Sequence, residues 1–99
     1  MKHIFTGAVR ERFAYSGFRV VCIELDPATH SSYRFRMLFF AESEHKPVLS
    51  INLETSILGS SCITQHLANT HNNLGPAEDE MSFESFKELA LNRADVVLH

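Results

Sequence analysis

The 6 His of this 99-residue chain, together with its 2 Cys, are the residues that first suggest a metal site. His66 and His71 form the densest local pair, at an i, i+5 spacing. That spacing fits no standard zinc motif, and a closed zinc site needs about four ligands. Folding would have to bring the others from residues such as His45, Glu54 or Cys62. The sequence therefore predicts no metal site, and favours histidines in a polar strand and an exposed loop.

Nucleophilic catalysis would require an activated thiol or hydroxyl. A thiol is activated by a neighbouring positive charge or base. Arg36 could supply the charge beside Cys22, and His66 could act as the base for Cys22 or Cys62. No further residue completes a catalytic motif, and the glycines are scattered singly, so a glycine-rich phosphate loop is excluded. We predict no catalytic residue and no cofactor, and the sequence favours a non-catalytic protein.

Composition indicates one small globular domain over residues 1–99, with 44% hydrophobic and 21% charged residues. The 9 Lys+Arg against 12 Asp+Glu give a net charge of -3, which argues against binding to nucleic acid or to an anionic membrane surface. No apolar run approaches the roughly 18 residues that a membrane span needs. The first residues also lack the apolar stretch of a signal peptide. We expect a cytoplasmic protein whose two cysteines stay reduced as small hydrophobic residues.

Alternating hydrophobicity predicts β-strands at 18–26, 33–42, 48–58 and 61–68. The stretch 3–15 fits a strand or a helix, and we favour a strand because Ser16 and Gly17 suit a hairpin turn. Residues 69–76 are rich in Asn, Gly and Pro and are predicted to form a loop.

A helix is predicted to begin after Ser82, a suitable N-cap, with one apolar face formed by Phe83, Phe86, Leu89, Ala90, Ala94 and Val97. Short connections between the strands imply that neighbours in sequence pair antiparallel. The predicted fold class is α+β: an antiparallel meander sheet of four to five strands with one C-terminal helix packed on one face.

The register of the strands decides which side chains share a face of the sheet. The register that we predict pairs Ile23 with Phe35, Met37 with Ile51, and Ile51 with Leu67. The face turned away from the helix then carries a polar row of Cys22, Arg36, Asn52 and His66 beside an apolar end formed by Phe18, Val20, Leu38, Phe40 and Val48.

That apolar end is the predicted partner-binding surface, because an exposed apolar patch rimmed by polar groups marks an interface. We expect a protein that self-associates as a homodimer or larger homo-oligomer, or that binds a protein partner through this face or a sheet edge. The alternative is a ligand- or metal-binding domain, enzymatic or not, with its site at Arg36, Asn52, His66 and His71. A third interpretation is a solvated face with cross-strand ion pairs, whose apolar end is covered by Ile4 and Phe5.

Overall fold

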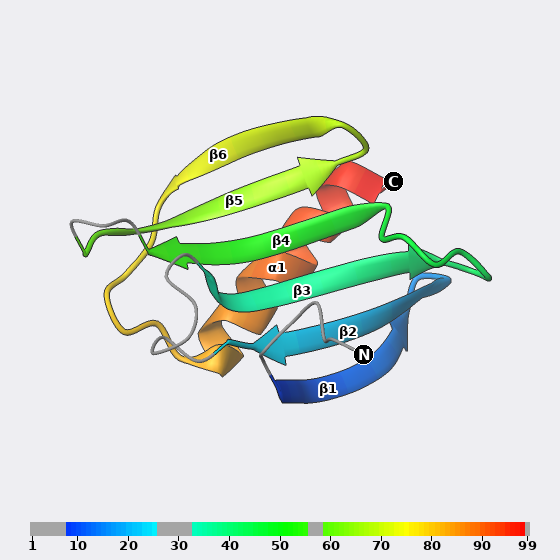
Figure 1. Cartoon of the computed structure of the whole chain (residues 1–99), viewed down its shortest axis with the longest axis horizontal. Helices are drawn as coiled ribbons and strands as arrows, with labels where there is room; N and C mark the ends of the chain where they lie inside the picture. The colour runs from blue at the N-terminus through cyan, green and yellow to red at the C-terminus, as the bar shows by residue number, and fades with distance from the viewer. Residues whose placement is uncertain (1–7, 26–32, 56–58, 99) are drawn as a thin grey trace, which may run out of the picture.

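A computed structural model describes residues 8–25, 33–55 and 59–98. These residues form one antiparallel sheet of six strands followed by a helix (Figure 1). The elements are β1 (Ala8–Tyr15), β2 (Phe18–Glu24), β3 (Tyr33–Ala41), β4 (Leu49–Thr55), β5 (Ser61–Leu67), β6 (Thr70–Pro76) and α1 (Phe83–Leu98). The strands lie in the sheet in sequence order, which confirms the predicted meander and the α+β class. The number of strands is six, not four to five.

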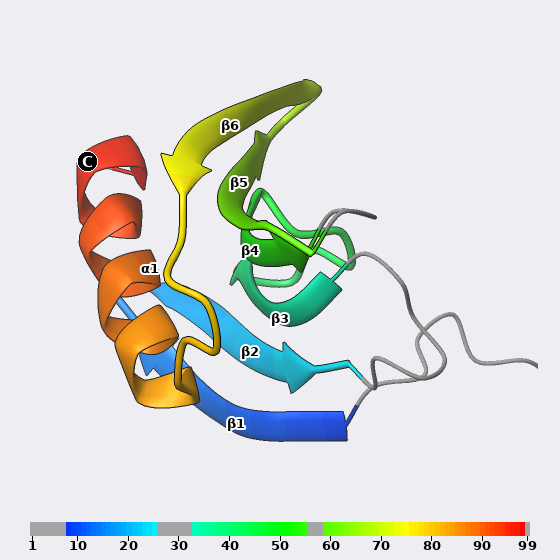
Figure 2. The ribbon, with the colours of Figure 1, turned by 90° about the vertical axis from the view of Figure 1, so that its left-hand side faces the viewer.

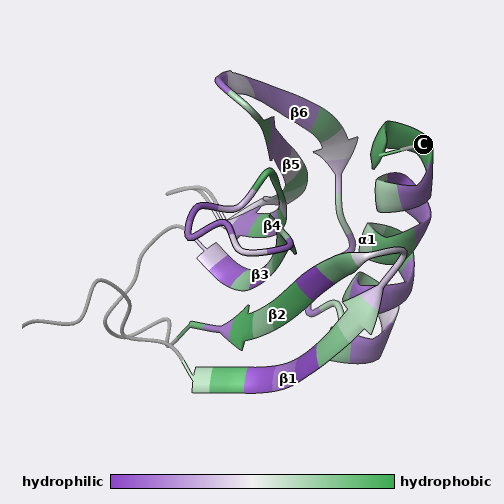
Figure 3. Ribbon diagram, turned by 90° about the vertical axis from the view of Figure 1, so that its right-hand side faces the viewer, coloured by the Kyte–Doolittle hydropathy of each residue, from purple (hydrophilic) through white to green (hydrophobic). Residues whose placement is uncertain are grey.

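The additional strand is β6, which occupies the stretch that was predicted to be a loop. Figure 3 shows the contrast between the largely hydrophilic ribbon of β6 and the largely hydrophobic ribbon of β2. Ala68, with a φ of 55°, lies in the two-residue connection to β5, and the side chain of Asn73 accepts a hydrogen bond from the backbone N–H of Gly75 at 2.8 Å. Residues typical of turns are therefore held in an edge strand, because pairing with β5 satisfies their backbone groups.

The N-terminal stretch is a strand, as predicted, over residues 8–15. Ser16 and Gly17 have φ angles of 51° and 85°, which a tight hairpin between β1 and β2 requires. Residues 3–7, including Ile4 and Phe5, lie outside the described residues, as do the last residues predicted for the strands 18–26 and 48–58.

Helix α1 begins where the sequence predicts, because Ser82 caps it: Ser82 Oγ accepts a hydrogen bond from the backbone N–H of Ser85 at 3.1 Å. The sheet curves around α1 (Figure 2), which crosses its centre over β3 and β4. Phe86 stacks on Phe35 of β3 with ring centroids 5.5 Å apart. The buried residues of the helix are Phe83, Phe86, Ala90 and Ala94.

The predicted register of β2 on β3 is wrong by one residue. Cys22 pairs with Met37, and Ile23 pairs with Arg36 instead of Phe35. Because successive side chains point to opposite faces, this shift turns Val20 and Cys22 toward α1 and Ile23 away from it.

Hydrophobic alternation could not fix this register, because both faces of β2 and β3 bury apolar side chains. A second apolar cluster lies on the face away from α1, with Ile23, Leu25 and Leu38 each less than 5% exposed. The register of β3 on β4 is confirmed at Met37 and Ile51. The predicted register of β4 on β5 is wrong by two residues, since Ile51 pairs with Gln65.

Both cysteines are free, as expected: Cys22 is buried and Cys62 is half-buried. No helix in the described part of the chain is long and apolar enough to cross a membrane.

Candidate functional site

The five residues of the predicted partner-binding surface do not share one face of the sheet. Val20 is 1% exposed in the core beneath α1, where Phe18 and Val48 also pack. Only Leu38 and Phe40 belong to the cluster on the opposite, helix-free face. The one-residue shift of β2 turns Phe18 and Val20 toward α1. The five residues therefore do not form a continuous surface.

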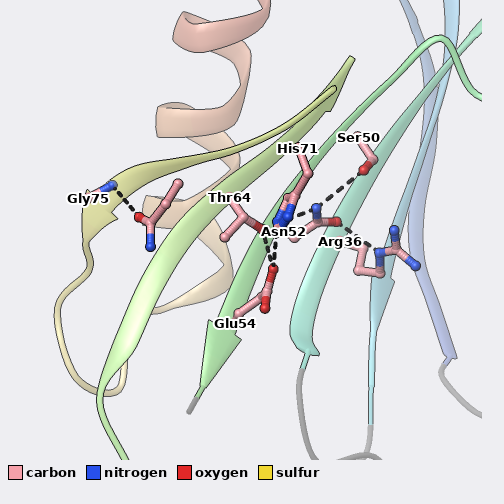
Figure 4. A network of polar contacts seen from close by, with 8 residues as sticks. Arg36, Ser50, Asn52, Glu54, Thr64, His71 and Gly75 are labelled. Carbon is pink, nitrogen blue, oxygen red and sulfur yellow. Dashed lines mark hydrogen bonds and ion pairs between the residues drawn. The ribbon is translucent and has the colours of Figure 1, made fainter. Parts of the chain in front are cut away.

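Arg36, Asn52 and His71 of the alternative site lie together on the helix-free face (Figure 4), and the ring of His66 packs against that of His71. Arg36 of β3, Asn52 of β4 and Thr64 of β5 are direct register partners across three strands. Cys22 is absent from this row, and Ile23 takes its place. The guanidinium of Arg36 also stacks on the ring of Tyr33 at 4.4 Å.

A directed chain of hydrogen bonds runs through this row toward a carboxylate. Arg36 Nε donates to Asn52 Oδ1 at 2.8 Å, which fixes the orientation of the fully buried Asn52 amide. Asn52 Nδ2 donates to Thr64 Oγ1 at 3.4 Å and to Ser50 Oγ at 3.2 Å. Thr64 Oγ1 donates in turn to Glu54 Oε2 at 2.5 Å. The chain therefore holds one oxygen of Glu54 in place.

Two histidines lie beside that carboxylate. His66 of β5 and His71 of β6 are register partners, and their ring centroids are 4.3 Å apart. His71 Nε2 lies 3.6 Å from Glu54 Oε2. His71 is therefore in a strand opposite His66, and the prediction that placed it in an exposed loop is wrong.

His66 has a ring nitrogen that forms no hydrogen bond with the described residues. This atom, Nε2, is buried, and a buried polar atom without a hydrogen-bond partner is uncommon. Burial of the ring, and then the charges of His71 and Arg36, lower the pKa of His66 from its ordinary value of 6.5, while Glu54 opposes them. The imidazole is thus held in its neutral form, which is the form that binds metals.

Glu54, His66 and His71 place ligand atoms within 4.8 Å of one another, which is a geometry suited to one metal ion. Sequence reasoning did not choose Glu54 for the site, although it named Glu54 as a ligand that folding could supply. The spacing of His66 and His71 could have predicted that the two residues pair. An i, i+5 spacing centred on a two-residue hairpin turn puts both residues directly opposite each other.

The other chemistry foreseen in the sequence is not assembled at this cluster. Cys22 faces α1 on the opposite side of the sheet. Burial, reinforced by Glu11, raises the pKa of its thiol to about 11, so Cys22 is a poor nucleophile near neutral pH.

Comparison of the chain with models of protein families, with curated proteins and with solved structures gives no match.

Proposed function

We propose that this protein binds a divalent transition-metal ion of the zinc class through Glu54, His66 and His71. The observation that carries the proposal is the convergence of their ligand atoms within 4.8 Å, at a histidine whose Nε2 has no partner. A bound cation would give the neutral ring of His66 the partner that the described residues lack.

The ligand atoms, which lie within 4.8 Å of one another, must move closer together to bind one ion. Zinc binds imidazole nitrogen and carboxylate oxygen at about 2.0–2.2 Å, so neighbouring ligand atoms of a tetrahedral site lie about 3.3 Å apart. The 3.6 Å between His71 Nε2 and Glu54 Oε2 is already close to that separation. His71 is on the edge strand, where its side chain is 54% exposed and has room to adjust.

The donor set selects the class of cation. Imidazole nitrogens suit Zn²⁺, Cu²⁺, Ni²⁺ and Fe²⁺, whereas Ca²⁺ and Mg²⁺ prefer oxygen donors. The negative charge of Glu54 offsets part of the repulsion between the cation and the nearby Arg36. The hydrogen bond from Thr64 orients the carboxylate in the way that outer contacts orient metal ligands in known sites.

A site with these three protein ligands leaves a coordination position for water or a small ligand, as in catalytic rather than structural zinc sites. His71 is exposed, so solvent can reach that position. The ligand-binding function that we propose is therefore a metal site open to exchange.

The experiment is a titration of tag-free, chelator-stripped protein with Zn²⁺ against a chromogenic chelator, together with native mass spectrometry of protein prepared without chelator. We expect one Zn²⁺ per chain, and affinity losses of about 100-fold or more for His66→Gln and His71→Gln, since each removes a ligand. His45→Gln, at an exposed histidine outside the cluster, is the matched control and should bind as the parent does.

A chain that takes up no zinc, or whose zinc affinity is the same in His66→Gln and His45→Gln, would rule the site out. The same mass spectra report the oligomeric state. Self-association through the face that carries Leu38 and Phe40 stays a prediction, which a dimer mass would support.

A further inference from the structure

The two flanks of α1 are closed to different extents. On the β1 side, Lys87 Nζ donates to Glu11 at 2.9 Å, and the hydroxyl of Tyr15 donates to Asp95 at 2.8 Å. These contacts join the helix to the first strand of the sheet. On the β5 and β6 side, a groove of about 420 Å³ remains between helix and sheet. The residues that line this groove come from β5, β6 and α1.

The groove is mainly apolar. Ile63 and Leu74 line it from the sheet, and Leu89 and Val96 line it from the helix. Val96 is 69% exposed, which makes it the most exposed large hydrophobic residue among the described residues. An apolar groove next to such a residue leaves hydrocarbon surface in contact with water, and a ligand with an apolar body would remove it.

One cation lies in this groove without a counter-ion. Arg93 is half-buried, and its Nε donates to Oε1 of the buried Gln65 at 2.7 Å. No carboxylate in the described part of the chain forms an ion pair with it. Asp95, two positions along the helix, is turned to Tyr15 on the other flank. Partial burial has removed hydration from this guanidinium, and no opposite charge among the described residues replaces it.

We propose that this groove binds a small amphiphilic anion, with a carboxylate against the guanidinium of Arg93 and a hydrocarbon body along Ile63, Leu74 and Leu89. Two features of the groove favour this occupant over a neutral one. The lining is mainly apolar with Arg93 as its one charged residue, and a guanidinium carries two Nη nitrogens besides the Nε that Gln65 engages, which suits it to a carboxylate.

The size of the groove limits the ligand. Small-molecule sites measure about 300–1,000 Å³, so this groove suits a compact ligand and is too small for a long lipid. The site lies on the face of the sheet that packs against α1, whereas the proposed metal site lies on the opposite face. The two proposals therefore stand or fall independently.

The test is a titration of ¹⁵N-labelled protein with octanoate below its micelle concentration, followed by the NMR chemical shifts of the amides. Two further ligands separate the parts of octanoate: 1-octanol has the hydrocarbon tail without the charge, and acetate has the carboxylate without the tail. We expect saturable shifts at the amides of Ile63, Leu74 and Leu89 with octanoate. Loss of the charge in Arg93→Gln should weaken the octanoate affinity by about tenfold, which is the effect of one charge-assisted hydrogen bond. Arg12→Gln, at an exposed arginine on β1, is the matched control.

Val96→Ser provides a second variant that does not disturb the core, because this side chain is 69% exposed. It should weaken octanoate and octanol alike. Octanoate that produces no saturable shifts, or that binds Arg93→Gln as tightly as the parent chain, would overturn the proposal. Octanol that binds as tightly as octanoate would overturn the part assigned to the anion.

Discussion

The hydroxyl of Thr64 donates a hydrogen bond to Oε2 of Glu54 across 2.5 Å, between two neighbouring strands of the helix-free face. The oxygen of Thr64 also accepts a hydrogen bond from Asn52 Nδ2 at 3.4 Å, so its hydroxyl links the Asn52 amide to the carboxylate. The carboxylate that we propose as a metal ligand is therefore oriented from outside the site.

Replacing that hydroxyl should weaken metal binding without removing a ligand. Thr64→Val keeps the shape of the side chain and loses the hydrogen bond to Glu54, and we expect about a tenfold loss of Zn²⁺ affinity, as for other contacts that orient a ligand. Thr64→Ser keeps the hydroxyl and should bind zinc within about twofold of the parent. Chelator competition measures both variants, and equal affinities for Val and Ser would contradict the positioning role.

The metal-free protein should lose stability when the pH falls below about 6.5. The folded state lowers the pKa of His66, chiefly by burial, so the unfolded chain binds more protons than the folded chain between the two pKa values. Stability therefore rises with pH through this window and falls as the pH is lowered through it.

Urea unfolding at a series of pH values from about 5 to 8, with chelator present, measures this slope for His66. His66→Gln should flatten the dependence, whereas His45→Gln, at an exposed histidine, should leave it unchanged. An identical slope in the His66 variant would assign the pH dependence to other groups.

Asn52 should be the most costly polar residue of the cluster to truncate. Its fully buried amide accepts from Arg36 and donates to Ser50 and Thr64, so Asn52→Ala leaves several partners unpaired. We expect a loss of about 1–3 kcal/mol in the free energy of unfolding, which chemical denaturation measures. Asn72→Ala, at an exposed position of β6, should change stability by less than about 0.5 kcal/mol. Equal effects of the two substitutions would show that the hydrogen-bond chain contributes nothing to folding.

Thiol labelling distinguishes the observed register of β2 from the predicted one. Cys22 is 0% exposed beneath α1, and burial raises its pKa to about 11, so only about one thiol in a thousand is ionised at pH 8. In the Cys62→Ser variant, an aromatic disulfide reagent should therefore label Cys22 only on unfolding. In the Cys22→Ala variant, the half-buried Cys62 should react in the native protein. Rapid native labelling of Cys22 would place it on the open face that the predicted register gave it.

Self-association is best tested at Phe40, which packs at the margin of the apolar cluster on the helix-free face. Phe40→Asp should abolish a dimer and leave a folded monomer, because Phe40 is only partly buried. Sedimentation measures the mass, and circular dichroism checks the fold. An unchanged dimer would remove this face as the interface.

The sequence by itself determined the elements whose signals are local. Ser82 and the apolar positions after it define α1, and Ser16 with Gly17 defines the first hairpin, because caps and tight turns depend on neighbouring residues. Strict alternation in β4 and the short connections were enough for the antiparallel meander and for the pairing of Met37 with Ile51.

The tertiary structure decided what local signals leave open. β6 is a strand only because β5 pairs with it, since the propensities of its Asn, Gly and Pro residues favour a turn. β2 and β3 bury apolar side chains on both faces, so alternation of hydrophobic residues does not distinguish the two registers. In the folded protein, Val20 and Cys22 pack in the core beneath α1.

The residues of the candidate site were likewise predictable from the sequence only in part. Alternation along the strands placed Arg36, Asn52 and His66 on one face, where the structure also has them, whereas His71 was predicted to lie in a loop. The sequence did not set His71 opposite His66, and so it did not bring His71 to Glu54. The contact of His71 with His66 depends on the edge strand β6, which forms by pairing with β5 and which its own residues do not favour.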